Sequence, residues 1–578
     1  MAKRKALDQP DAGLKGLDHY QQKLPRWRYK LRTALLPLVR WETPYLAWFQ
    51  ERMRNPSLDS WFAITANLGT HTFYMIMLPV LFWCGYTEIG RGIVHLLASG
   101  VFISGWFKDM LCLPRPLSPP LHRITMSGSA ALEYGFPSTH STNAISVVVY
   151  GLYLLNSPDS TVEPVAKIIF HVILYIFGTS IVIGRLYCGM HGFFDVITGS
   201  FLGALLGYVR YSYGESYDEL IYSGSINVIF AVVAVVLALV RMHPEPADSC
   251  PCFDDSLAFA GVLMGAEFGN WHFAQTTFAS NDPYPGTVPY DLAKLGWAKT
   301  IARIILGVVI VFLWREIMKP SLHKLLPPVF RVIERLGLNL PRRFFILASE
   351  YEKVPGHLKD DDVIPNVSEI PSILTSIRHP RRRAVSVGPQ SEADAYETLA
   401  YREKRRRESI SSNQSRSVSA GRRLPPTIED KRNKHNTSPA AAAAAAAATS
   451  GRPGNRKTNT PATDSNSFSP PAIRTPRKLD EYEHMMGTGT PVFNTEDILN
   501  MHGAGAGADV NVNVATGAAD TLEYQLEAEE EKVMFSKITP PRVRYDVEVV
   551  TKLVVYFGIG WLAVEFIPII FQLLGLAL

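Results

Sequence analysis

Long apolar runs, separated by short polar stretches, are the dominant pattern of this chain. Each run approaches the length of about 20 residues that a helix needs to cross a lipid bilayer, and few charges interrupt them. Several runs end in aromatic or basic residues, as at Trp106-Phe107-Lys108, which is typical of a membrane interface. The runs cover residues 61–83, 89–107, 142–155, 168–183, 193–209, 226–240, 300–314 and 553–578. The pattern predicts an all-α fold, a polytopic membrane helical bundle.

One further apolar stretch, residues 257–271, is short and differs from the others. It contains Gly261, Gly265 and Gly269, and also Glu267. A short apolar stretch with glycines and an internal charge is typical of a segment that enters the membrane and returns. We therefore expect this stretch to be re-entrant rather than spanning.

Composition divides the remainder of the chain. Residues 1–60 form a basic amphipathic segment, 61–319 a transmembrane domain, 320–349 an interfacial segment and 545–578 a final transmembrane segment. Residues 350–544 are rich in Ser, Thr, Pro, Arg and Asn and include nine consecutive alanines at 440–448. Such a composition buries too little apolar area to offset its ordering entropy, so we expect a long disordered insertion. Its Arg381–Ser386 stretch and its Ser-Pro and Thr-Pro pairs are candidate kinase sites.

The net charge of +5 matters less than its distribution. Residues 1–54 hold 12 Lys and Arg against 5 Asp and Glu, and residues 378–423 hold the same numbers. Both stretches suit cytoplasmic flanks, contacts with anionic lipid headgroups, or simply a solvated surface. Of the five cysteines, Cys250 and Cys252 are too close to each other to indicate a zinc pair on their own, and a disulfide with one of the others stays open.

Three short polar segments beside the apolar runs hold the residue types of a reactive site. The first, residues 108–116, places Lys108 and Arg115 seven positions apart. The second, residues 136–140, reads Phe-Pro-Ser-Thr-His directly before an apolar run. The third, residues 184–195, contains Arg185, His191 and Asp195. Taken singly, these segments have simpler interpretations: an orientation signal, a helix N-cap and a local pair on one helix face.

Taken together, the three segments suit phosphoryl transfer. Arg115 and Arg185 each offer a planar fork to phosphate oxygens, and Lys108 adds a compact charge. Ser138 and the free amides of a helix start suit an anion. A transferring phosphoryl group needs positive charge on its oxygens and an in-line nucleophile, and the histidines can supply the latter.

The order Lys-x6-Arg-Pro, Pro-Ser-x-His and Arg-x5-His-x3-Asp resembles the superfamily of type-2 phosphatidic acid phosphatases and vanadium haloperoxidases. Within it, residues 133–140 and 187–192 are similar to the sphingosine-1-phosphate phosphatases, especially the fungal enzymes for dihydrosphingosine and phytosphingosine 1-phosphates. Residues 545–548, before the last apolar run, are similar to theirs as well, whereas the long insertion is not. Gly184 stands where the family usually has a serine.

The resemblance implies a role for each residue. His191 attacks phosphorus and forms a phosphohistidine, and Asp195 holds its other ring nitrogen. His140 protonates the leaving lipid alkoxide and then helps activate water. The remaining residues hold the phosphate, without metal or other cofactor: Lys108, Arg115, Ser138, Thr139 and Arg185.

The expected partners are a lipid phosphate and the membrane, with no nucleic acid. A sphingoid base phosphate carries an ammonium group that phosphatidate lacks, so a carboxylate near the phosphate site would favour it. Glu133 is the first candidate for this role, with Asp109 second. Two alternatives remain: a phosphatase or phosphotransferase for another lipid phosphate, and a non-enzymatic transporter or scaffold.

The resemblance also implies an endoplasmic reticulum enzyme whose site faces the lumen, whereas the basic N-terminus favours the cytosol. A cytosolic insertion and a luminal site require an odd number of crossings between them. That count holds if residues 257–271 do not span. Asn366-Val367-Ser368 is a glycosylation sequon that reports the side of the insertion.

Overall fold

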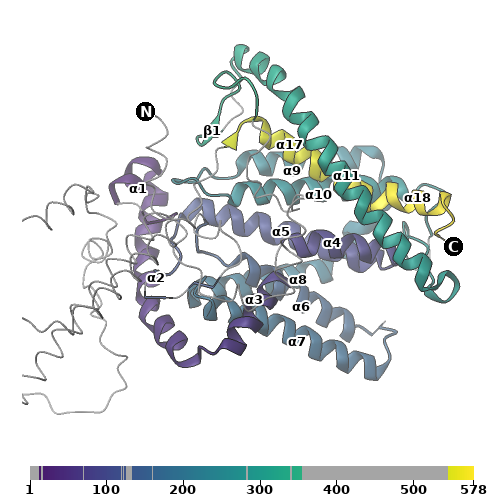
Figure 1. Ribbon diagram of the computed structural model, residues 1–578, viewed down its shortest axis with the longest axis horizontal. Helices are drawn as coiled ribbons and strands as arrows, with labels where there is room; N and C mark the ends of the chain where they lie inside the picture. The colour runs from purple at the N-terminus through teal and green to yellow at the C-terminus, as the bar shows by residue number, and fades with distance from the viewer. Residues whose placement is uncertain are drawn as a thin grey trace, which may run out of the picture. The chain divides into compact units, whose positions relative to one another are not determined.

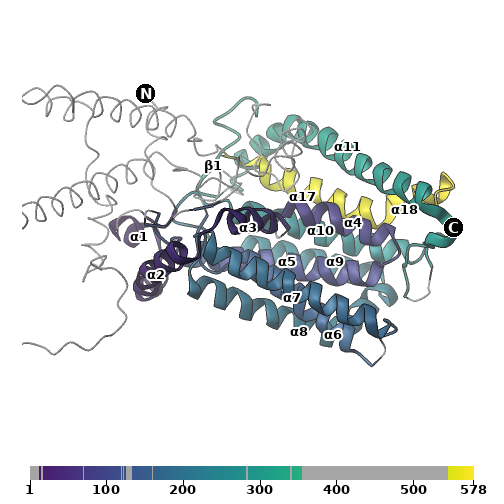
Figure 2. The ribbon, with the colours of Figure 1, turned by 60° about the horizontal axis from the view of Figure 1, so that its bottom comes forward.

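Helices make up almost all regular structure in the computed structural model (Figures 1 and 2). It describes residues 12–14, 17–68, 71–118, 120–121, 123–124, 133–158, 160–280, 284–338, 342–354 and 544–577. The helices before the insertion are α1 (Leu17–Lys23), α2 (Arg26–Met53), α3 (Pro56–Leu68), α4 (His71–Trp83), α5 (Thr87–Leu111), α6 (Thr139–Asn156), α7 (Pro164–Tyr187), α8 (Phe193–Ser223), α9 (Ile226–Met242), α10 (Cys252–Phe273) and α11 (Leu292–Arg335). After it come α17 (Val547–Trp561), the π-helix η4 (Leu562–Phe566) and α18 (Ile567–Leu573).

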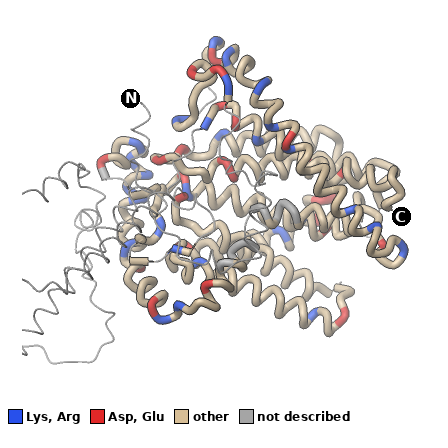
Figure 3. Tube along the Cα trace, viewed as in Figure 1, with Lys and Arg blue, Asp and Glu red and all other residues tan. Residues whose placement is uncertain are grey.

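Four helical stretches are long and apolar enough to cross a membrane: Thr87–Leu111, Pro164–Tyr187, Phe193–Ser223 and Val547–Leu573. Helix α9 is apolar but shorter. Apolar side chains such as Ile168 and Ile176 on α7 point outward and are more than half exposed, as on a lipid-facing surface. Figure 3 shows charged residues gathering toward the helix ends, with long uncharged stretches between. The all-α, multi-pass membrane fold is thus confirmed.

Two rows of glycine at intervals of four residues bring helix pairs into close contact. On α8, a Cβ at Gly203 would overlap the carbonyl oxygen of Thr142 on α6. On α10, a Cβ at Gly265 would overlap the carbonyl oxygen of Phe557 on α17. Small residues at this spacing let helix backbones approach within a membrane. The expectation of a re-entrant segment is therefore wrong: α10 is a continuous helix of 22 residues, and its glycines serve packing against α17.

The apolar run at 61–83 is also not one element, because α3 and α4 are separate helices of 13 residues each. Conversely, α11 is 44 residues long and continues through residue 319, where the sequence predicted the end of the transmembrane domain. That predicted boundary therefore coincides with no helix end. Gly296, with a φ of 75°, marks a kink inside it. Its proline pair Pro327-Pro328 lies within the helix.

The end of the bundle at which α5, α7 and α9 finish and α6, α8 and α10 start is called the site end below. Helix α2 lies across this end in Figure 1. Arg28 of α2 donates to the backbone oxygens of Asp109 and Met110, and Gln50 donates to that of Tyr187. The N-terminal helices therefore share a side with the three polar segments.

Both borders of the insertion lie at the site end as well. The two-residue strands β1 (Phe345–Ile346) and β2 (Arg544–Tyr545) pair in parallel. Arg342 donates to the carbonyl of His243, and Arg544 donates to that of Cys250. Since α8, α9, α10 and α11 each run the length of the bundle, four traversals separate the third polar segment from the insertion. These are traversals of the bundle. Of the four helices, α8 is long and apolar enough to cross a membrane by length and composition, so the odd number of membrane crossings stays a prediction.

Of the predicted insertion, residues 350–544, the part from 355 to 543 lies outside the described residues. This holds for its predicted disorder, the alanine run, the candidate kinase sites and the sequon at Asn366.

Candidate active site

The three polar segments, distant in sequence, meet at the site end. Lys108 lies in the last turn of α5, and Arg115 lies in the extended chain that follows. Ser138 caps α6, and its backbone N–H donates to the carbonyl of Asp195 on α8 at 3.1 Å. The backbone N–H groups of Met190 and His191 donate to the carbonyl of Arg185. These bonds join the starts of α6 and α8 to the end of α7.

His191 lies in the short loop before α8 and is 1% exposed. Its Nδ1 lies 3.5 Å from Oδ2 of Asp195, which is fully buried in the first turn of α8. The same carboxylate oxygen accepts the N–H of Gly192 at 3.0 Å. A carboxylate beside Nδ1 favours the tautomer with the proton on that nitrogen. The lone pair of His191 then lies on Nε2.

Nε2 of His191 faces a cation. It lies 3.1 Å from a terminal nitrogen of Arg115, and that nitrogen also donates to the carbonyl of Met190 at 2.8 Å. Burial lowers the pKa of His191 well below its ordinary value, and the positive charges of Arg115, Lys108 and Arg185 lower it further. The imidazole is therefore neutral at physiological pH.

Glu133 lies among the same cations. Its carboxylate accepts from Arg115 at 2.9 Å and from Lys108 at 3.3 Å, with the side chains of both cations 5% exposed. The Nε of Arg115 also donates to the backbone oxygen of Glu133. A carboxylate shared by two predicted phosphate ligands stands where an anion would bind.

The remaining predicted phosphate ligands differ in their contacts. Ser138 accepts from the N–H and the hydroxyl of Ser141, so the simpler interpretation as an N-cap applies to it. The hydroxyl of Thr139 lies 2.9 Å from that of Ser104 on α5. The Nε of Arg185 is buried without a hydrogen-bond partner among the described residues. His140, half-buried in the first turn of α6, is among the charges acting on His191.

Packing between two helices explains the glycine at position 184. A Cβ there would lie 3.0 Å from the ring of Phe62 on α3, so that glycine lets α3 pack against the end of α7. The family's usual serine hydroxyl is replaced here by an aromatic contact.

One residue with a clear place in the site was missed by the sequence analysis. Glu42 of α2 is 3% exposed and accepts the N–H of Phe194 at 2.9 Å, which caps the start of α8 between His191 and Asp195. Burial raises the pKa of its carboxyl. The sequence offered little signal, because Glu42 is one of two acidic residues, with Glu51, in a helix that carries six Lys and Arg.

Comparison with known proteins agrees with this arrangement. The PAP2 superfamily matches residues 91–217, which contain all three polar segments. A dihydrosphingosine 1-phosphate phosphatase of Schizosaccharomyces pombe is 38% identical over 346 residues, which cover 59% of this chain and 82% of that protein. The chain belongs to the sphingosine-1-phosphate phosphatase family of the PAP2 superfamily.

Other relatives agree. A dihydrosphingosine 1-phosphate phosphatase of Saccharomyces cerevisiae is 30% identical over 56% of this chain and 78% of its own length. The human sphingosine-1-phosphate phosphatase 2 is 26% identical over 50% of this chain and 73% of its own length. No solved structure matches the chain.

Proposed function

We propose that this protein hydrolyses the phosphate monoester of sphingoid long-chain base 1-phosphates, such as dihydrosphingosine and phytosphingosine 1-phosphate, in sphingolipid metabolism. The observation that carries the proposal is the placement of His191, with Asp195 beside Nδ1 and Arg115 facing Nε2. The names of the relatives support the substrate class, since the fungal ones act on dihydrosphingosine 1-phosphate.

The first half-reaction transfers the phosphoryl group to His191. A phosphate held by Arg115, Lys108 and Arg185 presents phosphorus to Nε2, because one of these guanidinium groups already lies 3.1 Å from that nitrogen. The Nε2–P bond forms while the ester P–O bond breaks. The proton of Nδ1 stays toward Asp195, which stabilises the charge that develops on the ring. His140 gives its proton to the departing lipid alkoxide.

The second half-reaction returns the protein to its starting state. His140, now neutral, takes a proton from water as the water oxygen attacks phosphorus. The Nε2–P bond breaks, inorganic phosphate leaves and His191 regains its lone pair. Ser138 and Thr139 complete the phosphate site through their position at the start of α6, where backbone amides favour an anion.

The substrate preference rests on Glu133. Phosphate that binds Lys108 and Arg115 displaces the carboxylate from both cations. The ammonium of a sphingoid base lies only a few bonds from the phosphate, so the released carboxylate is available to pair with it. Phosphatidate lacks this group and would displace Glu133 without compensation. Asp109, the second candidate, lies instead against His243 and two cysteines.

We further propose that the protein resides in the endoplasmic reticulum membrane. The site end also carries the N-terminal helices and both borders of the insertion. All of these then face the same compartment, and we propose that this compartment is the lumen.

The test is release of inorganic phosphate by the purified protein, left in its oxidised state and in the presence of EDTA. We expect release from dihydrosphingosine 1-phosphate to exceed release from phosphatidate, and to disappear in the His191→Ala variant. Added acceptor alcohol separates hydrolysis from transfer. Phosphate release that survives in His191→Ala, or that requires added divalent metal, would contradict the proposal.

A further inference from the structure

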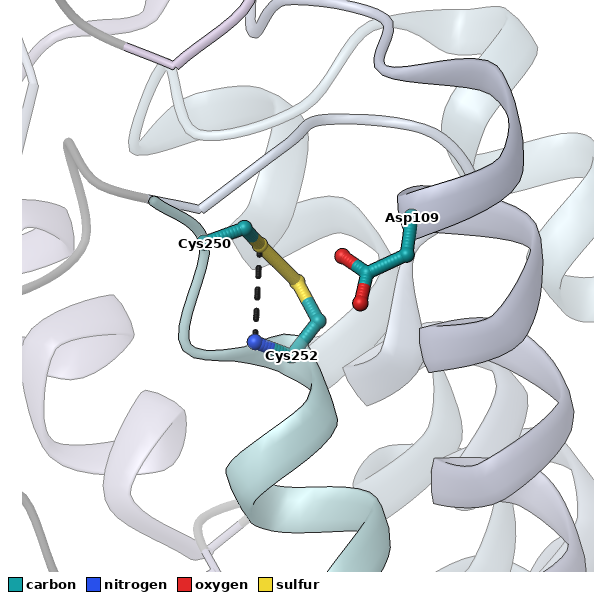
Figure 4. Close-up of side chains that lie close together, drawn as sticks. All are labelled: Asp109, Cys250 and Cys252. Carbon is teal, nitrogen blue, oxygen red and sulfur yellow. Dashed lines mark hydrogen bonds between the residues drawn. A yellow bond between two sulfur atoms is a disulfide. The ribbon is translucent and has the colours of Figure 1, made fainter. Parts of the chain in front are cut away.

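Behind Lys108, on the neighbouring side of α5, the structure gathers a second group of reactive side chains. Asp109 lies in the last turn of α5. Cys252 is the first residue of α10, and it forms a disulfide with Cys250 just before that helix. Figure 4 shows the carboxylate of Asp109 directed at the two sulfur atoms. One oxygen of Asp109 and both sulfurs lie within 4.8 Å of one another, and all three residues are buried.

The carboxylate of Asp109 is the unusual member. It is 0% exposed, yet neither of its oxygens has a hydrogen-bond partner among the described residues. A buried, ionisable group is costly unless something compensates for lost hydration. Nδ1 of His243, at the end of α9, lies 3.6 Å from Oδ2 of Asp109. Two helix ends thus bring two sulfurs and one carboxylate together, and an imidazole nitrogen from the end of α9 lies beside the carboxylate.

These donors are the types that bind zinc. Ligand bonds of about 2.0–2.3 Å in a tetrahedral site place neighbouring donor atoms roughly 3.3–3.8 Å apart. The separation between His243 and Asp109 already falls in that range. Cysteines two positions apart span the same distance once their sulfurs are not bonded to each other.

The surroundings have the features of a metal site. Nε2 of His243 lies 3.4 Å from the hydroxyl of Ser256, which donates to the carbonyl of Cys252. A ligating histidine usually uses its second nitrogen in this way. Nδ1 of His243 lies 3.3 Å from the carbonyl oxygen of Pro244, a contact that zinc binding at Nδ1 would replace. The backbone N–H of Cys252 donates to Sγ of Cys250, a contact that stabilises a thiolate.

Charge balance agrees. Two thiolates and one carboxylate around Zn²⁺ leave a net charge of −1. The guanidinium groups of Arg28, Arg342 and Arg544 act electrostatically on Asp109 and offset that charge.

We propose that Cys250, Cys252, Asp109 and His243 form a redox-controlled zinc site, closed as a disulfide under oxidising conditions and able to bind zinc when reduced. Reduction breaks the S–S bond and gives two thiols, while a dithiol reductant becomes a disulfide. Zinc then binds the two sulfurs, the carboxylate and Nδ1, and the thiol protons pass to solvent. Bound zinc would hold the end of α5, which carries Lys108, to the ends of α9 and α10.

The test measures metal, not catalysis, so that it is independent of the proposed function. The full chain, purified in detergent, is divided into an oxidised sample and an anaerobically reduced one, exposed to Zn²⁺, freed of excess metal and analysed for zinc. We expect about one more zinc per chain in the reduced sample. The Cys250→Ser/Cys252→Ser variant should lose that increment, and Cys84→Ser, a free cysteine elsewhere in the bundle, should keep it.

Co²⁺ in place of Zn²⁺ reports the donor set directly. Thiolate ligation gives the reduced protein a visible absorption band characteristic of tetrahedral cobalt, which Asp109→Asn and His243→Gln should weaken or shift. Equal zinc in the reduced and oxidised wild type would overturn the proposal and leave a plain disulfide. A cobalt spectrum that is the same in wild type, Asp109→Asn and His243→Gln would overturn the proposed ligand set.

Discussion

Replacing Glu133 by Gln separates two roles of one carboxylate. The side chain bridges Lys108 and Arg115 at 3.3 and 2.9 Å and is 25% exposed. Hydrogen bonds to charged groups contribute about 1.5–3 kcal/mol each, and partial exposure and the polar amide that remains reduce the loss. The carboxylate of Glu133 competes with a bound anion for these two cations. We therefore expect its removal to strengthen anion binding by about 1–2 kcal/mol. That corresponds to roughly tenfold tighter inhibition by orthovanadate, a phosphate mimic.

The same variant should lose substrate preference. Without a carboxylate to pair with the ammonium, the ratio of kcat/KM for dihydrosphingosine 1-phosphate over phosphatidate should fall by about tenfold, the effect of one partly exposed ion pair with good geometry. Both values are measured in detergent micelles, with Glu163→Gln at the far end of the bundle as the matched control. An unchanged vanadate constant would refute the competition, and an unchanged ratio would refute the ammonium contact.

Three further outcomes follow from the site. Lys108→Met removes a positive charge near His191 and should raise the pKa of His191 toward its ordinary value. The acid limb of the plot of kcat/KM against pH should therefore move to higher pH. A limb that does not move would mean that another group sets it. Glu42→Ala should lower the free energy of unfolding by about 1–2 kcal/mol, as loss of a helix cap does, and should also lower kcat. Glu42→Gln keeps an acceptor for the N–H of Phe194 and should retain most of the stability and most of the activity. Thermal unfolding and activity assays check the two variants. If the site is luminal, Asn366 should be glycosylated, because the insertion starts at the site end; a band unaffected by endoglycosidase, together with a luminal site, would be inconsistent with the fold.

The chemistry of the site was predictable because its residues lie beside helix boundaries. The combined residue types of the three segments indicated a phosphate site, and the family resemblance implied the roles of Lys108, Arg115 and His191. The fold brings these residues together. Apolar length likewise predicted an all-α membrane protein. Both inferences depend on short stretches of sequence, in which each helix end carries its own signal.

Contacts between distant elements were not predictable in the same way. Nothing near Glu42 indicates that α2 lies across the site end and caps α8, because that contact joins residues 152 positions apart. The glycines of α10 suggested a broken segment, yet their function depends on Phe557, far along the chain. The sequence left open a disulfide with one of the other cysteines, but Cys250 and Cys252 pair with each other, and Cys84, Cys112 and Cys188 are free. This pairing likewise required knowledge of the loop between α9 and α10.

The order of the helices places the borders of the insertion. A hydropathy count alone could not tell whether residues 257–271 run through the bundle, and the predicted odd number of crossings depended on that segment. The close packing of Gly265 against α17 makes α10 a helix that traverses the bundle, and both borders of the insertion lie at the site end.

The central claim is the nucleophilic role of His191, and trapping the covalent intermediate tests it most directly. Protein mixed with sphingoid base phosphate carrying radioactive phosphorus is quenched within the first turnover, and the label is assayed for the acid lability and alkali stability of phosphohistidine. We predict label on the peptide that contains His191 and none in His191→Ala. Label that persists on the His191→Ala protein would contradict the mechanism. Normal hydrolysis of the labelled substrate with no label on the wild-type protein would contradict it as well.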